Sequence, residues 1–422
     1  MHAPGRSFGQ GSALRRRQIQ YKSISADGHV NEPPELWTKN LPAKFRDRGP
    51  RIIETVKTKG HAWIMEGQTR PSPMGFSSMY TRGSKRFDRA SLIDSFKQIK
   101  DRGVRYEDVF PGSYDAKERI KELIEDETDA EVIFNGVQTV WNGIKLCPDK
   151  ELSLACYKVY NDWMVEFQET DPTRFICNAT LPTTGLKDCM EELRRCVDMG
   201  LRTVQLEAYP SGDFANPTPE DDKFWAMCQE MDIPVNLHVQ FFFPAGDLLS
   251  KPTAEAVAEM KQKMKATRGL DVSAGNFNTV VQRLTSTGVF ERFPNLKFIG
   301  SEVHAGWVPY FMEKWDESVR RNRSEWTQPL LPSEYVNRNV WFVYTVDEMG
   351  AENRYNIGVD KMMWGPDFPH SSSCWPMDYQ VGREVLLRSG ATESEIERIM
   401  WKTCADIFKL PYDQPSKLSK AA

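Results

Sequence analysis

Eight short runs of β-branched, aromatic and other apolar residues recur along the chain, and segments with helical periodicity separate most of them. The runs occupy residues 23–30, 131–137, 174–181, 203–208, 234–239, 296–302, 340–345 and 361–367. Several are nearly continuous apolar stretches, which is typical of parallel strands that are buried on both faces. Eight strands that alternate with helices predict an α/β fold of the (β/α)₈ TIM-barrel type.

The helical segments can be placed from the spacing of their apolar residues, which is clearest at residues 151–169. Further helices are expected at residues 186–199, 219–231, 276–290, 307–321, 347–357, 377–389 and 392–408. Asp188 is a candidate N-terminal cap for the first of these. Thr392, with Glu395 three residues later, predicts a capping box at the start of the last.

The chain is longer than a barrel requires, because a barrel body takes about 250 residues and this chain has 422. The surplus lies in two insertions, residues 38–128 after the first strand and residues 240–275 after the fifth. The second insertion contains an expected helix at 253–268. Both follow C-terminal strand ends, where barrel active sites lie, so we expect them to form lids or substrate walls.

We expect a single barrel domain over residues 23–410. An arm-like or disordered segment rich in arginine, residues 1–22, precedes it, and a tail, residues 411–422, follows it. The arm contains no secretory apolar segment, and an arginine-rich, acid-poor start of this kind is also found in organellar transit peptides, which is the alternative to an arm.

The overall composition excludes several classes of protein. With 55 basic and 59 acidic residues, the net charge of −4 argues against a dedicated nucleic-acid binder. No apolar run approaches the length of about 18 residues that a transmembrane helix needs, so no membrane partner is expected. The eight cysteines form no Cys-x-x-Cys pair, which favours free thiols in a reducing compartment and a cytoplasmic location.

Polar residues gather at the C-terminal ends of the predicted strands. Four of the six histidines lie there, namely His29, His238, His304 and His370. Five carboxylates accompany them, namely Asp27, Glu32, Glu207, Glu302 and Asp367. Residues i and i+2 of a strand point to the same side, so Asp27 and His29 both face the barrel mouth, as do Glu302 and His304.

Imidazole and carboxylate groups in this arrangement suit a divalent cation such as Zn²⁺, Mn²⁺ or Fe²⁺. His238 and Asp367 come from other strands and would complete a four-ligand set with Asp27 and His29. The sequence therefore predicts a metal centre at the mouth of the barrel. We expect it to bind one ion, and binding of a second ion is an alternative.

Four segments carry a resemblance to a known family. They are SADGHVNEPPELW at 25–37, NLHV at 236–239, SEVHAGWVPYFMEKWD at 301–316 and WGPDFPHSSSCWP at 364–376. In these segments the chain resembles the amidohydrolase-related metal enzymes, which include aminocarboxymuconate-semialdehyde decarboxylase and the aromatic-acid decarboxylases. The segments run from the first strand to the eighth, so the resemblance covers most of the chain apart from the insertions.

The resemblance implies that His29, His238 and Asp367 are metal ligands and that His304 lies near the position of the catalytic histidine. Asp27 stands where many members carry His or Glu. No lysine in the fourth run matches the carbamylated bridge of binuclear amidohydrolases, and Glu207 stands there instead. A homodimer that acts on a small molecule is the family expectation.

Five further residues are candidates for supporting roles, and they are Glu32, Glu207, Glu302, His370 and Trp307. Glu32 and Glu302 could each bind a second metal or orient a histidine. His370 lies three residues past Asp367 and could polarise that carboxylate or contact the substrate. Trp307, just past a strand end, is a candidate wall of an aromatic pocket.

Two reactions fit these residues, and both make the chain a metal-dependent hydrolase or carboxy-lyase of a small organic carboxylate. In hydrolysis Asp367 accepts a proton from water and His304 stabilises the oxyanion. In non-oxidative decarboxylation a protonated Asp367 or His304 delivers a proton to carbon, and CO₂ leaves. The nitrogen and oxygen ligands also suffice for two irons, so a non-haem di-iron oxygenase is an alternative, and a non-enzymatic binding protein is a third.

Overall fold

Eight parallel strands form one sheet in the computed structural model of the chain. The structure describes residues 20–56, 59–68, 71–74, 103–136, 138–213, 216–239, 277–370 and 372–412. The strands are β1 (Ile24–His29), β5 (Ala130–Phe134), β6 (Phe175–Thr180), β7 (Thr203–Gln205), β8 (Val235–His238), β9 (Phe298–Ser301), β10 (Val340–Tyr344) and β11 (Met362–Trp364). Each is hydrogen-bonded to the next in chain order, and each coincides with one of the eight predicted runs.

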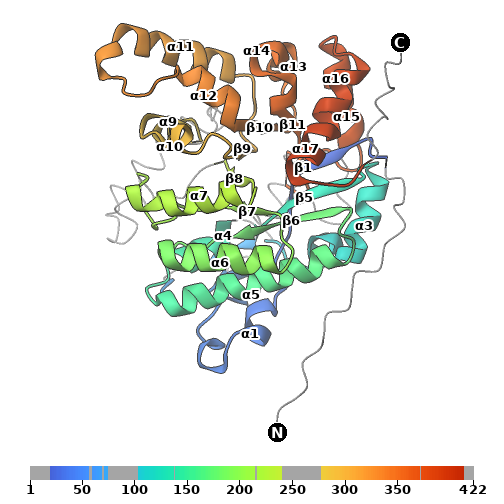
Figure 1. Ribbon diagram of the computed structural model, residues 1–422. Coiled ribbons are helices and arrows are strands. Elements are labelled where there is room, and N and C mark those ends of the chain that lie inside the picture. Colours follow the sequence, from blue (N-terminus) through green and yellow to red (C-terminus); the bar gives the residue numbers. More distant parts are fainter. Residues whose placement is uncertain are drawn as a thin grey trace, which may run out of the picture.

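The segment that follows β11 closes the sheet against β1. The amide of Asp367 donates to the carbonyl of Asp27 at 2.9 Å, and the amide of His29 donates to the carbonyl of Phe368 at 2.8 Å. Gly28 and Phe368 form a parallel bridge. The predicted barrel is therefore confirmed (Figure 1).

The main helices lie on the outside of this sheet (Figure 1). They are α3 (Ala116–Glu125), α5 (Lys150–Glu169), α6 (Leu186–Asp198), α7 (Asp222–Glu230), α9 (Phe277–Ser286), α11 (Val308–Arg321) and α15 (Asp378–Arg388). Shorter helices are α1 (Leu36–Asn40), α4 (Gln138–Lys145), α10 (Val289–Arg292), α12 (Pro332–Asn339), α13 (Glu348–Glu352), α14 (Arg354–Ile357), α16 (Glu393–Glu397) and α17 (Thr403–Phe408). Single 3₁₀ turns lie at Ala43–Phe45, Tyr106–Asp108, Pro111–Ser113, Pro219–Asp221, Arg323–Glu325 and Val359–Lys361.

The helix ends test two of the predicted caps. The capping box of Thr392 and Glu395 is present at the start of α16, and a π-helical turn, Arg398–Lys402, joins α16 to α17. The predicted cap at Asp188 is wrong, because α6 begins at Leu186 after Gly185. Asp188 lies in the first helical turn, where its carboxylate accepts a hydrogen bond from the Thr184 hydroxyl at 2.6 Å.

Apolar side chains fill the space between the sheet and the helices, as the predicted strands require. All five residues of β5 are buried, and so are all six of β6. Phe277 of α9 stacks on Phe298 of β9 with ring centroids 5.6 Å apart and planes 5° apart. Burial on both faces explains why these strands appear in the sequence as apolar runs rather than as alternating patterns.

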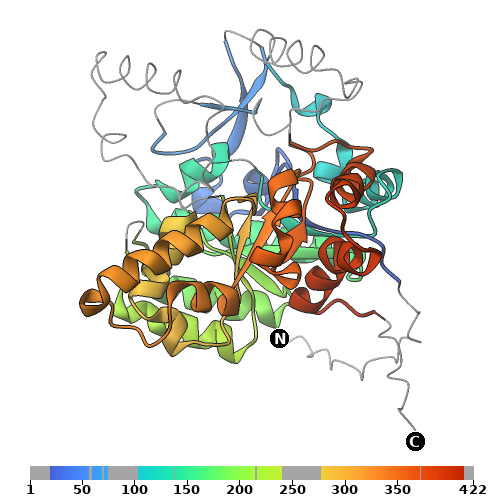
Figure 2. The ribbon, with the colours of Figure 1, turned by 90° about the horizontal axis from the view of Figure 1, so that it is seen from above.

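The described residues of the predicted first insertion, 38–128, form secondary structure of their own. They contribute α3 and a small antiparallel sheet of β2 (Arg51–Glu54), β3 (His61–Ile64) and β4 (Ser72–Pro73). The blue strands β2 and β3 lie at the edge of the molecule in Figure 2, and β3 and β4 contact α4. The second insertion, including the helix expected at 253–268, lies outside the described residues.

The thiols agree with the expected free state, since all eight cysteines are unpaired and all but Cys374 are buried. Among the described residues we find no helix that has both the length and the apolar character needed to span a bilayer.

Candidate metal centre

Four side chains from distant parts of the sequence converge at the carboxyl ends of the strands. Asp27 and His29 come from β1, His238 ends β8, and Asp367 follows β11. Each offers one nitrogen or oxygen atom, and these four atoms all lie within 4.8 Å of one another. The structure thus brings together the four residues that the sequence placed in one set.

The shortest distances lie around the His29 ring. Its Nε2 atom is 2.9 Å from Nε2 of His238, 3.1 Å from Oδ1 of Asp367 and 3.5 Å from Oδ1 of Asp27. Nε2 of His238 lies 3.2 Å from the same Asp27 oxygen. Asp27, His29 and Asp367 are almost completely buried, whereas His238 keeps 14% of its side chain exposed.

The backbone of Asn135 fixes the orientation of His29. The Nδ1 atom of His29 lies 2.6 Å from the Asn135 carbonyl. A carbonyl only accepts, so Nδ1 carries the proton and the lone pair of Nε2 faces the other three donors. This is the arrangement that metal-binding histidines adopt.

The donor set fits a divalent cation. Oδ2 of Asp27 is buried without a hydrogen-bond partner among the described residues, and an unsatisfied buried carboxylate oxygen is costly unless a ligand or ion contacts it. Two imidazoles and two carboxylates suit Zn²⁺, Mn²⁺ or Fe²⁺.

The charges at the site also favour a cation. Burial by itself raises the pKa of a carboxyl group, yet the neighbouring histidines hold the pKa of Asp27 and of Asp367 below the usual range. Conversely, burial opposes protonation of His29, and the carboxylates of Asp27 and Asp367 outweigh it and raise the pKa of His29. The two carboxylates therefore stabilise positive charge where the four donor atoms meet.

Several residues at this rim have unusual backbone conformations. Glu302, His304 and Asp367 have φ angles of 57°, 56° and 66°. Such left-handed conformations are uncommon for residues other than glycine and concentrate at functional sites. The strain lies where side chains must turn from the strand ends into the mouth.

Two residues of the following loop contact Asp367. Oδ1 of Asp367 is 2.8 Å from Nδ1 of His370, and Oδ2 accepts a short hydrogen bond from the Ser372 hydroxyl. The His370 ring stacks on His29 with centroids 4.0 Å apart. His370 is therefore adjacent to both residues, as its spacing from Asp367 suggested, while its role stays a prediction.

Glu32 and Glu302 lie outside the four-residue group, and their proposed metal binding stays a prediction. The Glu32 carboxylate accepts hydrogen bonds from the Trp141 indole at 2.7 Å and from the Gly136 amide at 2.8 Å. Burial raises the pKa of Glu32 to about 7. Burial and the charges of Asp367 and Asp27 raise the pKa of Glu302 well above its usual value.

Glu207 has an unforeseen partner. Its carboxylate forms a buried ion pair with Lys145 at the end of α4, and it accepts hydrogen bonds from Gln205 at 2.6 Å and from Asn135 at 3.4 Å. Asn135 donates to Glu207 through its side-chain amide and accepts from His29 through its backbone carbonyl, so it links this ion pair to the candidate metal centre.

His304 and Trp307 lie on the loop between β9 and α11. His304 is exposed among the described residues. The Trp307 indole donates to the Val303 carbonyl at 2.8 Å, and its ring packs edge-on against Phe342. Asp347 stabilises the same loop, because its Oδ2 accepts hydrogen bonds from the backbone amides of residues 305 and 306 at 2.6 and 2.8 Å. The catalytic role of His304 and a substrate contact by Trp307 stay predictions.

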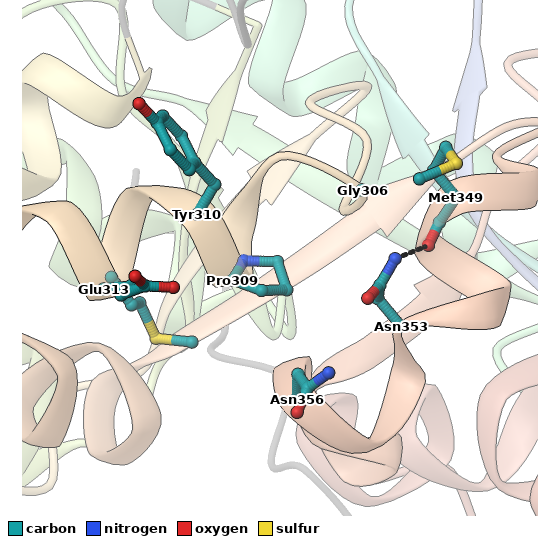
Figure 3. A pocket seen from close by; sticks show the side chains of 8 residues that line it. Gly306, Pro309, Tyr310, Glu313, Met349, Asn353 and Asn356 are labelled. Atoms are coloured by element: carbon teal, nitrogen blue, oxygen red, sulfur yellow. Dashed lines mark hydrogen bonds between the residues drawn. The ribbon is translucent and has the colours of Figure 1, made fainter.

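A groove of about 570 Å³ begins beside this loop, at Gly306, and runs between α11 and the pair α13–α14. Figure 3 shows Pro309, Tyr310 and Met349 along it. Tyr310 and Met349 are 68% and 59% exposed. None of the four clustered donors lines this groove, so it is separate from the candidate metal centre.

Sequence reasoning missed several residues that support the site. Asn135 acts through its carbonyl, which leaves no mark in a sequence. Lys145 ends α4, a helix that the sequence analysis did not predict, and Ser372 belongs to a run of serines. Gly28, between Asp27 and His29, was the one available signal, because a glycine inside a strand indicates a close approach of another group.

A barrel with an imidazole–carboxylate cluster at the carboxyl ends of its strands has the architecture of a metal-dependent barrel enzyme. The chain belongs to the amidohydrolase family, whose model, described as Amidohydrolase, matches residues 150–410. This family assignment confirms the resemblance that the sequence motifs indicated.

Curated proteins similar to the chain are decarboxylases by name. Decarboxylase orsB of Emericella nidulans is 24% identical over 255 residues, which are 58% of this chain and 72% of that protein. Gamma-resorcylate decarboxylase of a Polaromonas species is 24% identical over 269 residues, 59% of this chain and 75% of that protein.

Solved structures share the fold. An amidohydrolase from Mycobacterium avium subsp. paratuberculosis matches with a TM-score of 0.68 at 22% identity, covering 92% of this chain and all of that chain. A dihydroxybenzoic acid decarboxylase from a Polaromonas species, with bound manganese and the inhibitor 2-nitroresorcinol, matches with a TM-score of 0.59 at 17% identity, covering 93% and 98%.

Together these findings make the chain a metal-dependent enzyme of the hydrolase or carboxy-lyase type. The alternative of a di-iron oxygenase gains no support. The relatives are named decarboxylases and amidohydrolases, and the described residues hold a single cluster of four donors.

Proposed function

We propose that the protein is a non-oxidative decarboxylase of a hydroxylated aromatic carboxylic acid and that it uses one divalent cation, with manganese as the first candidate. The observation that carries the proposal is the convergence of Asp27, His29, His238 and Asp367 at the barrel mouth. The names of the curated relatives and the manganese in a structural neighbour support the reaction and the metal.

Hydrolysis and decarboxylation use the same ligand set, so the choice between them rests on other features. Both curated relatives described above are decarboxylases by name. At the end of β7 the chain carries Glu207, which is paired with Lys145, where binuclear amidohydrolases need a bridging lysine. These features favour a single cation and decarboxylation.

When bound, the cation supplies a Lewis acid that anchors anionic oxygens of the substrate. Asp27, His29, His238 and Asp367 would hold it. In the proposed reaction Asp367 passes a proton to the ring carbon that bears the carboxylate, with His370 at 2.8 Å as the adjacent proton source. The bond from that carbon to the carboxylate then breaks, its electron pair restores the aromatic ring, and CO₂ leaves.

The residues around the mouth are assigned supporting roles within the same proposal. His304 assists proton delivery from the rim, and Trp307 borders the substrate. Glu32 and Glu302 orient the ligands. Glu207 and His370 support His29 and Asp367 through the contacts described above.

The proposal extends to the organisation of the protein. Residues 23–410 form one catalytic domain between an arm, residues 1–22, and a tail, residues 411–422. The eight free cysteines suit a reducing cytoplasm. We further propose a homodimer, which is open to measurement by light scattering.

The test is a metal-reconstitution assay. The purified chain is stripped with a chelator, reloaded with Mn²⁺, Zn²⁺ or Fe²⁺, and given 2,6-dihydroxybenzoate, 5-carboxyvanillate and the methyl ester of each. CO₂ release from a free acid, with about one ion bound per chain, is expected. Cleavage of an ester without CO₂ release from any acid would assign hydrolysis instead and overturn the proposal.

A further inference from the structure

A buried arginine and glutamate lie directly behind the metal centre. Arg119 of α3 and Glu131 of β5 are 0% and 1% exposed. Two parallel hydrogen bonds join them, from Nε at 2.8 Å and from Nη2 at 2.9 Å. Removing two charges from water is expensive and is often no better for stability than apolar packing, so a pair in this position invites a functional explanation.

Arg119 also reaches the segment that carries Asp367. Its Nη2 donates to the carbonyl of Phe368 at 3.2 Å, and the guanidinium lies 4.5 Å from the centre of the Phe368 ring. The same carbonyl accepts the amide of His29 at 2.8 Å. The Phe368 carbonyl oxygen therefore accepts hydrogen bonds from Arg119 and from the backbone amide of His29. Phe368 itself directly follows Asp367, another of the candidate ligands.

Gly28 shows how closely the pair approaches β1. A Cβ atom at this position would lie 2.0 Å from Oε1 of Glu131 and 3.0 Å from Nη2 of Arg119. Gly28 stands between Asp27 and His29, so the ion pair packs against the backbone that joins these two donors. Glycine is required here because of the space that the pair occupies.

We propose that Arg119, oriented by Glu131, is a positioning residue for the metal centre. By binding the Phe368 carbonyl it fixes the junction between β1 and the segment after β11, and that junction sets the spacing of Asp27, His29 and Asp367. The inference rests on the proposed metal centre but not on which reaction the metal serves.

The test measures Mn²⁺ affinity by competition with a chelator, together with urea unfolding of the metal-free protein. Arg119→Lys keeps a charge beside Glu131 but lacks the fork that binds Glu131 and the Phe368 carbonyl together. The double variant Arg119→Met/Glu131→Gln removes both charges and leaves none unpaired. Groups that orient metal ligands typically change affinity by about 10- to 100-fold, and we expect a loss in this range for both variants.

The matched control is Arg354→Met. Arg354 is another buried arginine, on α14, and it pairs with Glu395 at 3.4 Å. This variant should lower stability and leave Mn²⁺ affinity unchanged.

Wild-type Mn²⁺ affinity in Arg119→Lys, or in a folded double variant, would overturn the inference and reduce the pair to a structural role. If the double variant does not fold, Arg119→Lys decides alone. Failure of the proposed function looks different, because the unmodified protein would then bind metal without releasing CO₂ from any acid, or would not bind metal at all.

Discussion

The Nε2 atoms of His29 and His238 face each other at 2.9 Å, and their rings cross at 83°. The proton of His29 is on the opposite side of its ring, where Nδ1 contacts the Asn135 carbonyl. The lone pair of its Nε2 therefore points toward His238 and the two aspartates. The hydrogen bond to the Asn135 carbonyl thus fixes Nε2 of His29 among the other three donor atoms, as expected of a residue that binds a cation.

Metal binding should stabilise the fold measurably, because a ligand that binds only the native state adds its binding free energy to stability. At a Mn²⁺ concentration 100-fold above Kd, the free energy of unfolding should rise by about 2.7 kcal/mol over the chelated protein. Urea unfolding with and without metal provides the measurement. His238→Ala, which removes one donor, should lose most of the gain, and an undiminished gain in that variant would place the metal elsewhere.

Asp367→Asn should abolish most of the turnover while leaving the fold intact. Asn keeps the size of the side chain and one oxygen for the Ser372 hydroxyl, but it cannot pass a proton. Loss of a positioned acid or base typically lowers the rate by about 10²- to 10⁴-fold, so kcat should fall at least this far. Ser372→Ala is the comparison variant and should retain most of its activity. Near-normal turnover of Asp367→Asn would remove Asp367 from the mechanism.

The ion pair between Lys145 and Glu207 should be sensitive to the loss of either partner. Lys145→Met leaves a carboxylate that is 9% exposed without its counter-charge, which typically costs about 3–5 kcal/mol. Urea unfolding should show this loss, and the double variant Lys145→Met/Glu207→Gln should recover most of it. Additive losses in the double variant would show that the two groups do not stabilise each other.

Much of the fold was predictable because parallel strands buried on both faces appear as apolar runs, and each of the eight runs became a strand. The convergence of the four candidate ligands was predictable for a related reason. Barrel strands bring their carboxyl ends to one rim, so Asp27, His29, His238 and Asp367 had to meet once the strands were placed.

The features of the site that the sequence did not predict depend on single contacts between residues far apart in the chain. Helix α3 lies inside a segment interpreted as an insertion, and its Arg119 pairs with Glu131 across the barrel wall. Charged residues usually mark solvated faces, so neither looked like a core residue. The cap assigned to Asp188 is wrong because α6 begins at Leu186, with Gly185 as its N-cap residue, so Asp188 lies inside the first turn.

The stability of the fold should depend on pH through Glu122 of α3. Its Oε1 accepts the Gly112 amide at 3.0 Å, while Oε2 is buried with no hydrogen-bond partner among the described residues. Burial raises the pKa of Glu122 to about 7, with Arg119 opposing the rise and Glu131 adding to it. The unfolded chain has the ordinary pKa near 4.5, so between these values the native state holds a proton that the unfolded state has released.

The stabilisation from that proton is therefore complete below pH 4.5 and is lost as the pH rises to about 7, with a total of about 3 kcal/mol at 1.36 kcal/mol per pKa unit. Glu122→Gln stays neutral throughout, so its free energy of unfolding minus that of the unmodified protein should rise by up to this amount across the window. Urea unfolding at several pH values measures the difference. Glu125→Gln, on the exposed face of the same helix, is measured in parallel as the comparison variant. If the Glu122→Gln difference does not change with pH, Glu122 is ionised in the native state, and its Oε2 must then have a partner such as an ordered water.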